Sequence, residues 1–242
     1  MKYCQALLHQ RKNIMKAIRR HVLLIGAAWL CLISSAIGQS SQAEIPIPES
    51  IPIFPLQDIM LFPGASRPLH IFEPRYRDMI VDAMEGDRII GMVMLRPNNE
   101  NNYDGNPPIY DIGCAGLLSN IERLSDGRYN VIVQGLKRFR ITGEDQRRTY
   151  RIASINVLDE VFSEADRATL RAQRPLLLEL LSSVAPGQKP TVDEVSDDML
   201  VNGLAQFLGM NPADRLDLLQ QEGPLARSDA LLSLLDQGAL SR

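Results

Sequence analysis

The sequence predicts an α+β protein, in which a mostly antiparallel β-barrel with one inserted helix is followed by a C-terminal helical bundle. Between residues 51 and 158, short apolar or alternating segments recur between Gly and Pro turns, as in small barrels. One segment among them, Pro74–Glu85, carries apolar residues at helical spacing. After Ser163 the whole pattern becomes helical. We therefore expect two domains, residues 44–160 and 161–242.

The barrel is expected to begin with a strand, a turn at Phe62–Gly64 and a second strand over Pro68–Phe72. Proline is tolerated in strands at edges and strand starts, which favours a place at the barrel rim. Glu73 and Pro74 then open the inserted helix, since the missing N–H of a proline would be unpaired in a first helical turn anyway. This helix is expected to plug one end of the barrel.

The remaining strands are separated by a polar loop over Pro97–Pro108 and by Asp126-Gly127, a pair that favours a tight hairpin. Alternating or continuous apolar runs predict these strands. They are expected over Arg88–Leu95, Ile109–Leu124, the alternating segment from Tyr129 to Thr142, and Tyr150–Leu158.

Four short amphipathic helices are expected in the second domain, where they must pack on one another and on the barrel. Ser163 with Asp166 resembles a capping pair, and Pro175 should break or kink the first helix. A linker over Val184–Asp193 comes next. The later helices are expected to start near Ser196, Asn211-Pro212 and Pro224, with Leu200, Leu204, Phe207 and Leu208 of the second helix facing inward.

The N-terminal 43 residues differ from the rest in charge. They contain six Lys or Arg and no Asp or Glu, so the remainder has 20 basic and 29 acidic residues and a net charge of −9. Basic residues precede the uncharged run 22–38, and small residues follow it, which is the secretory signal-peptide pattern. We expect cleavage after Gly38 or Ala43 and export to the periplasm. An uncleaved anchor formed by residues 22–38 is the alternative, and the true start is either Met1 or Met15.

Three cysteines are present, of which Cys4 and Cys31 lie in the signal segment. The exported chain would keep Cys114 alone, which cannot form an internal disulfide, so its stability must come from packing. Cys114 lies in an apolar run and is expected to be a small buried residue.

Several segments in the right order resemble the Lon N-terminal (Lon protease substrate-binding) domain family, in its stand-alone form. The resemblance covers Ile51 to Leu240 and implies a PUA-like barrel that recognises unfolded or exposed polypeptide segments. The segments that carry it are Pro52–Leu56, Leu61–Gly64, Leu69–Tyr76, Ile112–Leu117 and Asp126–Ile141.

No catalytic site, cofactor or metal is expected. A Lon-type peptidase needs a phosphate-binding loop and a Ser-Lys pair, and the nearest imitation of such a loop, Gly187–Thr191, has a proline after its lysine and lacks the spaced first glycine. His70 is the one histidine after residue 43, which argues against a His-based metal site or a Ser-His-Asp triad. A hydrolase built on Cys114 and His70 is the alternative that remains in this class.

The expected binding site is apolar and lies at the barrel rim. An exposed cluster there would hold an extended apolar segment of another chain. The competing interpretation is that the same side chains fill the interface between barrel and helices. The residues concerned are Met60, Leu61, Phe62, Phe72 and Tyr76.

Nucleic acid is not expected as a partner, because the mature chain is acidic. A local basic group is nevertheless present, and the PUA fold meets RNA in other proteins, so an RNA-binding domain is a further alternative. The expected partners are unfolded or exposed polypeptide segments and an envelope protease or chaperone, with a membrane only if the N-terminal segment is uncleaved. The basic group consists of Lys137, Arg138, Arg140, Arg147, Arg148 and Arg151.

Overall fold

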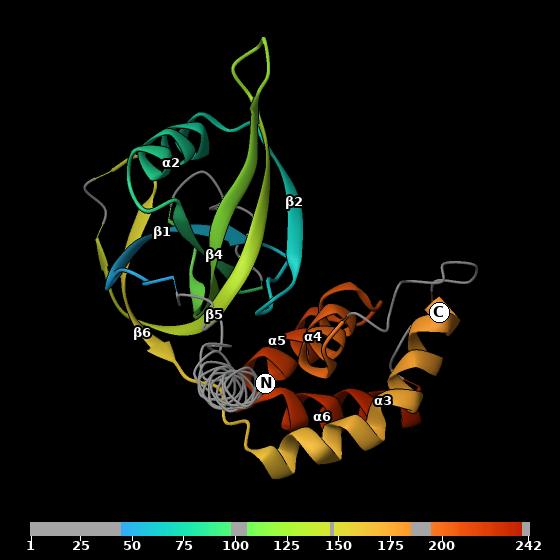
Figure 1. Ribbon diagram of the computed structural model, residues 1–242. Helices are drawn as coiled ribbons and strands as arrows, with labels where there is room; N and C mark the ends of the chain where they lie inside the picture. Colours follow the sequence, from blue (N-terminus) through green and yellow to red (C-terminus); the bar gives the residue numbers. More distant parts are fainter. Residues whose placement is uncertain (1–44, 98–105, 146–147, 185–194, 239–242) are drawn as a thin grey trace, which may run out of the picture. The chain divides into compact units, whose positions relative to one another are not determined.

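A computed structural model of the chain, drawn in Figure 1, describes residues 45–97, 106–145, 148–184 and 195–238. Apart from Ile45, these residues belong to one compact unit. The expected signal segment lies outside the described residues. So do most of the loop expected over Pro97–Pro108 and most of the linker expected over Val184–Asp193.

Six strands form one mixed sheet in the order β2-β5-β4-β3-β1-β6. Every neighbouring pair is antiparallel except β1 and β3, which run parallel. The strands are β1 (Ser50–Leu56), β2 (Ser66–Ile71), β3 (Ile89–Leu95), β4 (Ile109–Arg123), β5 (Tyr129–Asp145) and β6 (Arg151–Leu158).

The sheet curls into a barrel because β6 pairs with β1 and also with the second half of β5. The first half of β5 pairs instead with β2. The barrel is not strictly closed, since within the described part of the chain β2 has β5 as its one partner strand. Figure 1 shows β2 along one side of the curled sheet. The predicted α+β class and mostly antiparallel barrel are confirmed.

Helix α2 (Pro74–Glu85) is the inserted helix, and its bounds match the sequence prediction. Glu73 is the N-cap residue, Pro74 follows it, and Gly86 ends the helix. The helix turns Tyr76, Met79, Ile80 and Ala83 into the barrel core, where Tyr76 meets Phe54 edge to face with ring centroids 4.5 Å apart.

The turn before β2 is fixed to β5 by backbone contacts. Gly64 has a φ of 72°, which a glycine adopts without strain, and its N–H donates to the Gly135 carbonyl at 2.9 Å. The Gly135 N–H donates in turn to the Ala65 carbonyl at 2.8 Å. A Cβ atom at Gly135 would lie 2.0 Å from the Phe62 carbonyl oxygen, so no side chain fits where the turn crosses β5.

Four helices make up the C-terminal bundle. Ser163 and Asp166 cap α3 reciprocally, because Asp166 N donates to Ser163 Oγ and Ser163 N donates to Asp166 Oδ2. α3 continues through Pro175, so the helix is not broken there; Leu170 and Leu177, on either side of the proline, are both fully buried and hold it in place. The helices are α3 (Glu164–Val184), α4 (Asp197–Phe207), α5 (Pro212–Gln220) and α6 (Pro224–Asp236).

The buried apolar residues form two clusters inside the barrel and a third within the bundle. The bundle cluster also includes barrel residues, among them Met60, Phe62 and Ile112. The bundle therefore rests on the barrel through a continuous apolar layer. Among the described residues, no helix is both long and apolar enough to cross a membrane.

Candidate functional site

Four of the five predicted rim side chains are buried. Met60, Leu61, Phe62 and Tyr76 expose between 0% and 4% of their surface, whereas Phe72 exposes 60%. These four side chains therefore do not form the exposed apolar cluster that a rim site requires.

Packing of the bundle explains this difference. Met60 and Phe62 lie in the bundle cluster, as the competing interpretation of the sequence had it, while Leu61 and Tyr76 lie in the barrel core. Gln206 of α4 closes the junction, because its Oε1 accepts from the Phe62 N–H at 3.1 Å and its Nε2 donates to the Ser66 carbonyl at 2.9 Å. One amide side chain thus satisfies backbone groups on both sides of the turn.

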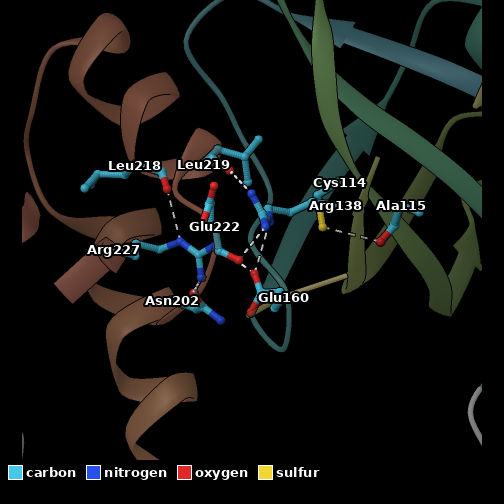
Figure 2. Close-up of polar contacts among 9 residues, drawn as sticks. All are labelled: Cys114, Ala115, Arg138, Glu160, Asn202, Leu218, Leu219, Glu222 and Arg227. Carbon is cyan, nitrogen blue, oxygen red and sulfur yellow. Dashed lines mark hydrogen bonds and ion pairs between the residues drawn. The ribbon is translucent and has the colours of Figure 1, made fainter. Parts of the chain in front are cut away.

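A buried ionic network, shown in Figure 2, joins the bundle to the barrel. Arg138 of β5 and Arg227 of α6 are 3% and 0% exposed, and both donate to one oxygen of Glu160, at 3.1 and 2.7 Å. Buried guanidinium groups need acceptors for their other N–H groups. Arg138 finds them in the Leu219 and Glu222 carbonyls, and Arg227 in the Leu218 carbonyl and the Asn202 side chain.

This network has an electrostatic cost that Glu160 offsets. Burial, and after it the charge of Arg227, lowers the pKa of Arg138, while Glu160 acts in the opposite direction. Two cations held close together in the interior are stable because the carboxylate lies between them. The position of α6, and through Asn202 that of α4, is therefore tied to the barrel.

Helix α4 shows an inverted distribution of polar and apolar residues. Asn202 and Gln206 are 2% and 1% exposed, whereas Met199 and Phe207 are 44% and 62% exposed. Met199, Gly203 and Phe207 follow one another at intervals of four residues and so share one face of the helix. We call this face the α4 strip; at 1.5 Å per residue it is about 12 Å long.

Segments of the barrel flank the α4 strip. The Arg67 guanidinium of β2 lies 5.1 Å from the centre of the Phe207 ring and donates to the Gln206 carbonyl at 3.2 Å. Burial, with a smaller effect of nearby Arg215, lowers the pKa of Arg67. At the other end, a Cβ atom at Gly64 would lie 3.3 Å from Met199 Cγ. The strip is thus held in place by the same turn and strand that Gln206 anchors.

The free edge of β2 is poorly suited to pairing with another strand. The Ala65 carbonyl accepts from β5, so alternation directs the backbone groups of Ser66, Pro68 and His70 away from β5. The Ser66 carbonyl on this edge is occupied by Gln206, and Pro68 has no N–H to donate. An incoming chain would therefore bind by its side chains rather than by extending the sheet.

Phe72, the exposed member of the predicted set, lies just beyond β2. Its ring stacks on that of His70, with centroids 6.4 Å apart and 27° between the planes. His70 Nδ1 lies 2.8 Å from Asn130 Oδ1, and its Nε2 lies 3.1 Å from Arg128 Nη1. The aromatic pair is an exposed feature of the strand, separate from the residues that form the α4 strip.

The structure gives no support to a hydrolase built on Cys114 and His70. Cys114 is fully buried and donates from Sγ to the Ala115 carbonyl at 3.5 Å, as Figure 2 shows. Burial, and then the charge of Glu160, raises the pKa of this thiol far above its usual range. His70 is exposed and bonded to other partners, so the two residues lack the geometry of a nucleophile and its base.

The basic residues of the RNA alternative are paired with acids. Lys137 pairs with Asp159, Arg140 with Asp111 and Arg148 with Asp82, at 3.3, 2.6 and 3.2 Å. Arg138 and Arg151 are buried beside Glu160 and Glu144, and Arg147 lies outside the described residues. Each described cation of this group thus faces a carboxylate instead of contributing to an open basic surface.

The described architecture is that of an open β-barrel braced by a helical bundle, with an apolar strip at their junction. The family model for the ATP-dependent protease La (LON) substrate-binding domain matches residues 50–237 of this sequence. The chain therefore belongs to the LON substrate-binding domain family, as the resemblance in the sequence indicated.

Relatives and solved structures agree with this assignment. The Lon protease of Trichlorobacter lovleyi is 26% identical over 204 residues, which cover 81% of this chain and 25% of that protein. A Lon N-terminal domain protein from Xanthomonas campestris has the same fold, with a TM-score of 0.52 and 23% identity over 76% of this chain and 97% of that one. The N-terminal domain of Mycobacterium avium complex Lon protease gives a TM-score of 0.60 and 16% identity, over 77% and 98% of the two chains.

The chain spans about a quarter of the length of the Lon proteases that it matches. The match is thus to the substrate-binding domain, without the protease and ATPase domains. The family assignment supports a substrate-recognition module.

Sequence reasoning missed the α4 strip. Phe207 was expected to face inward with Leu200, Leu204 and Leu208; the three leucines are buried, but Phe207 is not. A signal was present, because Met199, Gly203 and Phe207 repeat every four residues beside the leucine face. It was masked by the usual rule that polar residues such as Asn202 and Gln206 face solvent.

Proposed function

We propose that this protein is a non-catalytic polypeptide-binding module, acting as an adaptor or holdase that takes apolar segments of unfolded or exposed chains on the α4 strip. Membership of the LON substrate-binding domain family supports recognition of polypeptides. The observation that carries the proposal is the inversion on α4, where polar side chains are buried and Met199 and Phe207 are exposed. Exposed apolar side chains grouped on one face are typical of interaction sites.

The geometry suits a short extended segment. A strip of about 12 Å corresponds to roughly four residues of extended chain at 3.3 Å each, of which every second side chain would face the strip. Arg67 holds the Phe207 ring from one side and offers a cation at the rim of the contact. Binding of this kind makes and breaks no covalent bond, and it uses side chains because the β2 edge is blocked at Pro68.

We further propose that the protein acts after export to the periplasm, with an envelope protease or chaperone as partner. The order of basic, apolar and small residues in segment 1–43 supports export. N-terminal sequencing of the native protein should find Gln39 or Glu44 first. A native chain that still contains residues 22–38 would instead support the membrane-anchored alternative.

The α4 strip is tested by a double change, Met199→Ser with Phe207→Ser. If both side chains are buried on binding, their loss should cost about 2 kcal/mol, or roughly thirtyfold in affinity for a reduced and carboxymethylated model protein. Leu176→Ser is the matched control, because Leu176 is an apolar side chain of α3 that is 53% exposed and is not one of the residues of the strip. Equal loss of affinity in both proteins, or no loss in either, would contradict the assignment of the strip.

The wider proposal is tested by crosslinking in the intact cell envelope, with the same unfolded protein as reference. Enrichment of unfolded chains or of a protease or chaperone is the expected result. Enrichment of neither would overturn the adaptor and holdase proposal.

A further inference from the structure

The Phe207 end of the α4 strip carries a positive charge that the described residues do not fully neutralise. The Arg67 guanidinium lies 5.1 Å from the centre of the exposed Phe207 ring. No carboxylate in the described part of the chain forms an ion pair with it. This distinguishes Arg67 from the two arginines of the buried network, which share the carboxylate of Glu160.

Arg67 also differs from the other described arginines whose pKa is lowered by burial. In those three, Arg138, Arg151 and Arg215, a nearby carboxylate acts in the opposite direction. For Arg67, the effect that comes after burial is the charge of Arg215, a second cation, which lowers the pKa further. A half-buried cation beside another cation favours contact with a negative group.

Part of the Arg67 guanidinium can be reached from solvent. Nη2 donates to the Gln206 carbonyl at 3.2 Å, and Nε is buried without a partner. Nη1 donates to no group of the described residues and, unlike Nε, is not buried, so it is the donor that an incoming acceptor can reach. The C-terminal end of α4 offers a partial negative charge of about half an elementary charge, but Arg215 shares it by donating to the Leu208 carbonyl at 2.7 Å. Arg67 therefore keeps most of its positive charge.

The spacing along the α4 strip matches one face of an extended chain. Met199, Gly203 and Phe207 follow one another at about 6 Å along the helix, and residues i, i+2 and i+4 of an extended chain are about 6.6 Å apart on one face. Gly203 leaves room between the two larger side chains, since nothing lies within 4 Å of a Cβ atom there. Because Asp198 directly precedes Met199, an acidic side chain of a bound segment fits better at the other end, beside Arg67.

We propose that the α4 strip selects segments in which two apolar side chains and one Asp or Glu side chain lie in a row on one face, with the acidic carboxylate accepting from Arg67 Nη1. The inference rests on the proposed function and deepens it, because it states which polypeptide segments the strip holds. Segments with the pattern apolar-x-apolar-x-acid, in one chain direction, bind better than equally apolar segments without the charge.

The test compares peptides that differ in one functional group. Gly-Ser-Leu-Ser-Leu-Ser-Glu-Ser-Gly, acetylated and amidated at its ends, is titrated into the full chain beside its Gln form. Both are repeated with the residue order reversed, because either chain direction fits the strip. In one of the two orders the Glu form should bind at least about fivefold more tightly than the Gln form, a gain between that of an exposed ion pair and that of a hydrogen bond to a charged group. Equal affinity of the Glu and Gln forms in both orders would overturn the proposal.

Variants locate the effect. Arg67→Gln removes the charge but keeps a donor for the Gln206 carbonyl, so the ratio of Glu-form to Gln-form affinity should fall close to one. Arg140→Gln is the matched control: it removes an equal charge from a side chain that is 50% exposed and paired with Asp111, and it should leave the ratio unchanged. A preference for Glu that persists in the Arg67→Gln protein, or that disappears equally in both variants, would overturn the proposal.

The outcomes separate the two proposals. Should Arg67→Gln unfold the protein, the Arg67 Nε–Hε NMR signal of the original protein decides, and equal shifts with the Glu and Gln forms would overturn the preference. If the two forms bind equally, or no peptide binds, while the double change at Met199 and Phe207 still lowers the capture of unfolded chains, the acidic preference alone fails. If that double change leaves capture intact, the proposed function fails and this inference fails with it.

Discussion

At the scale of single residues, the missing side chain of Gly135 lets the turn before β2 pack directly against β5. The turn that carries Phe62 crosses β5 so tightly that its carbonyl occupies the space of a side chain. The same crossing supplies the hydrogen bonds between Gly64, Ala65 and Gly135. Since this turn also packs beside Met199 and leads to Arg67, the shape of the α4 strip depends on one missing side chain.

Gly135→Ala should therefore be strongly destabilising. The added methyl must push the turn away from β5, which should lower the free energy of unfolding by at least about 2 kcal/mol in urea denaturation. Gly203→Ala provides the contrast, because nothing lies within 4 Å of a Cβ atom there and alanine favours a helix by up to about 1 kcal/mol. A Gly135→Ala protein as stable as the Gly203→Ala protein would contradict this account of the turn.

The environment of Tyr150 predicts that the free energy of unfolding falls in alkaline solution. Burial, and then its 2.5 Å hydrogen bond to Asp82, raises the pKa of Tyr150 to about 12. The unfolded chain loses the phenol proton near pH 10, so this contribution to stability is complete below about pH 10 and disappears as the pH rises towards 12. Urea denaturation at several pH values should show a steeper alkaline loss in the original protein than in Tyr150→Phe. Parallel pH profiles would show that the tyrosine does not contribute.

At the scale of elements, the sequence predicted the strands and helices better than it predicted which of their side chains are exposed. Helix α2 was predictable to the residue, because a proline at its start and Gly86 at its end are local signals that need no tertiary contact. Pro175 was harder, since packing on both sides of it outweighs a local rule. The α4 strip was missed and the burial of the rim was left open, because which face of a helix meets solvent depends on partners that are distant in sequence, here Phe62 and Ser66 against Gln206.

The edge strand β2 gives a prediction of its own. Pro68→Val adds an N–H to the free edge of β2 and introduces a residue that favours strands. Edge-to-edge pairing should then appear as concentration-dependent dimers in size-exclusion chromatography. Gln134→Val is the matched control: Gln134 is exposed opposite Ser66 on β5, which is already paired on both sides. A Pro68→Val protein that elutes like the control at every concentration would show that the proline does not protect the edge.

At the scale of the whole molecule, barrel and bundle are joined by an apolar layer and by one shared carboxylate. Glu160 lies between guanidinium groups contributed by β5 and α6, more than eighty residues apart in the chain. Removal of one member of a buried ionic network leaves the others uncompensated and costs more than the intact network contributes. We therefore expect the packing of the bundle on the barrel to weaken when one member of this network is removed.

Glu160→Gln should lower the free energy of unfolding by about 3 kcal/mol, measured by urea denaturation. Asp111→Asn is the control, because it removes an exposed pair with Arg140 and should cost no more than about 1 kcal/mol. Similar stability of the two variants would mean that the apolar layer alone joins the parts.

The proline in β2 has one more consequence. If the protein holds unfolded chains, as we propose, it repeatedly contacts segments that can stack as strands, and an open sheet edge would offer them a template for fibril growth. With Pro68 lacking a donor and the Ser66 carbonyl already taken, a captured segment finds no such template here. Under the proposed function, the domain would hold such a chain without becoming the seed of an amyloid.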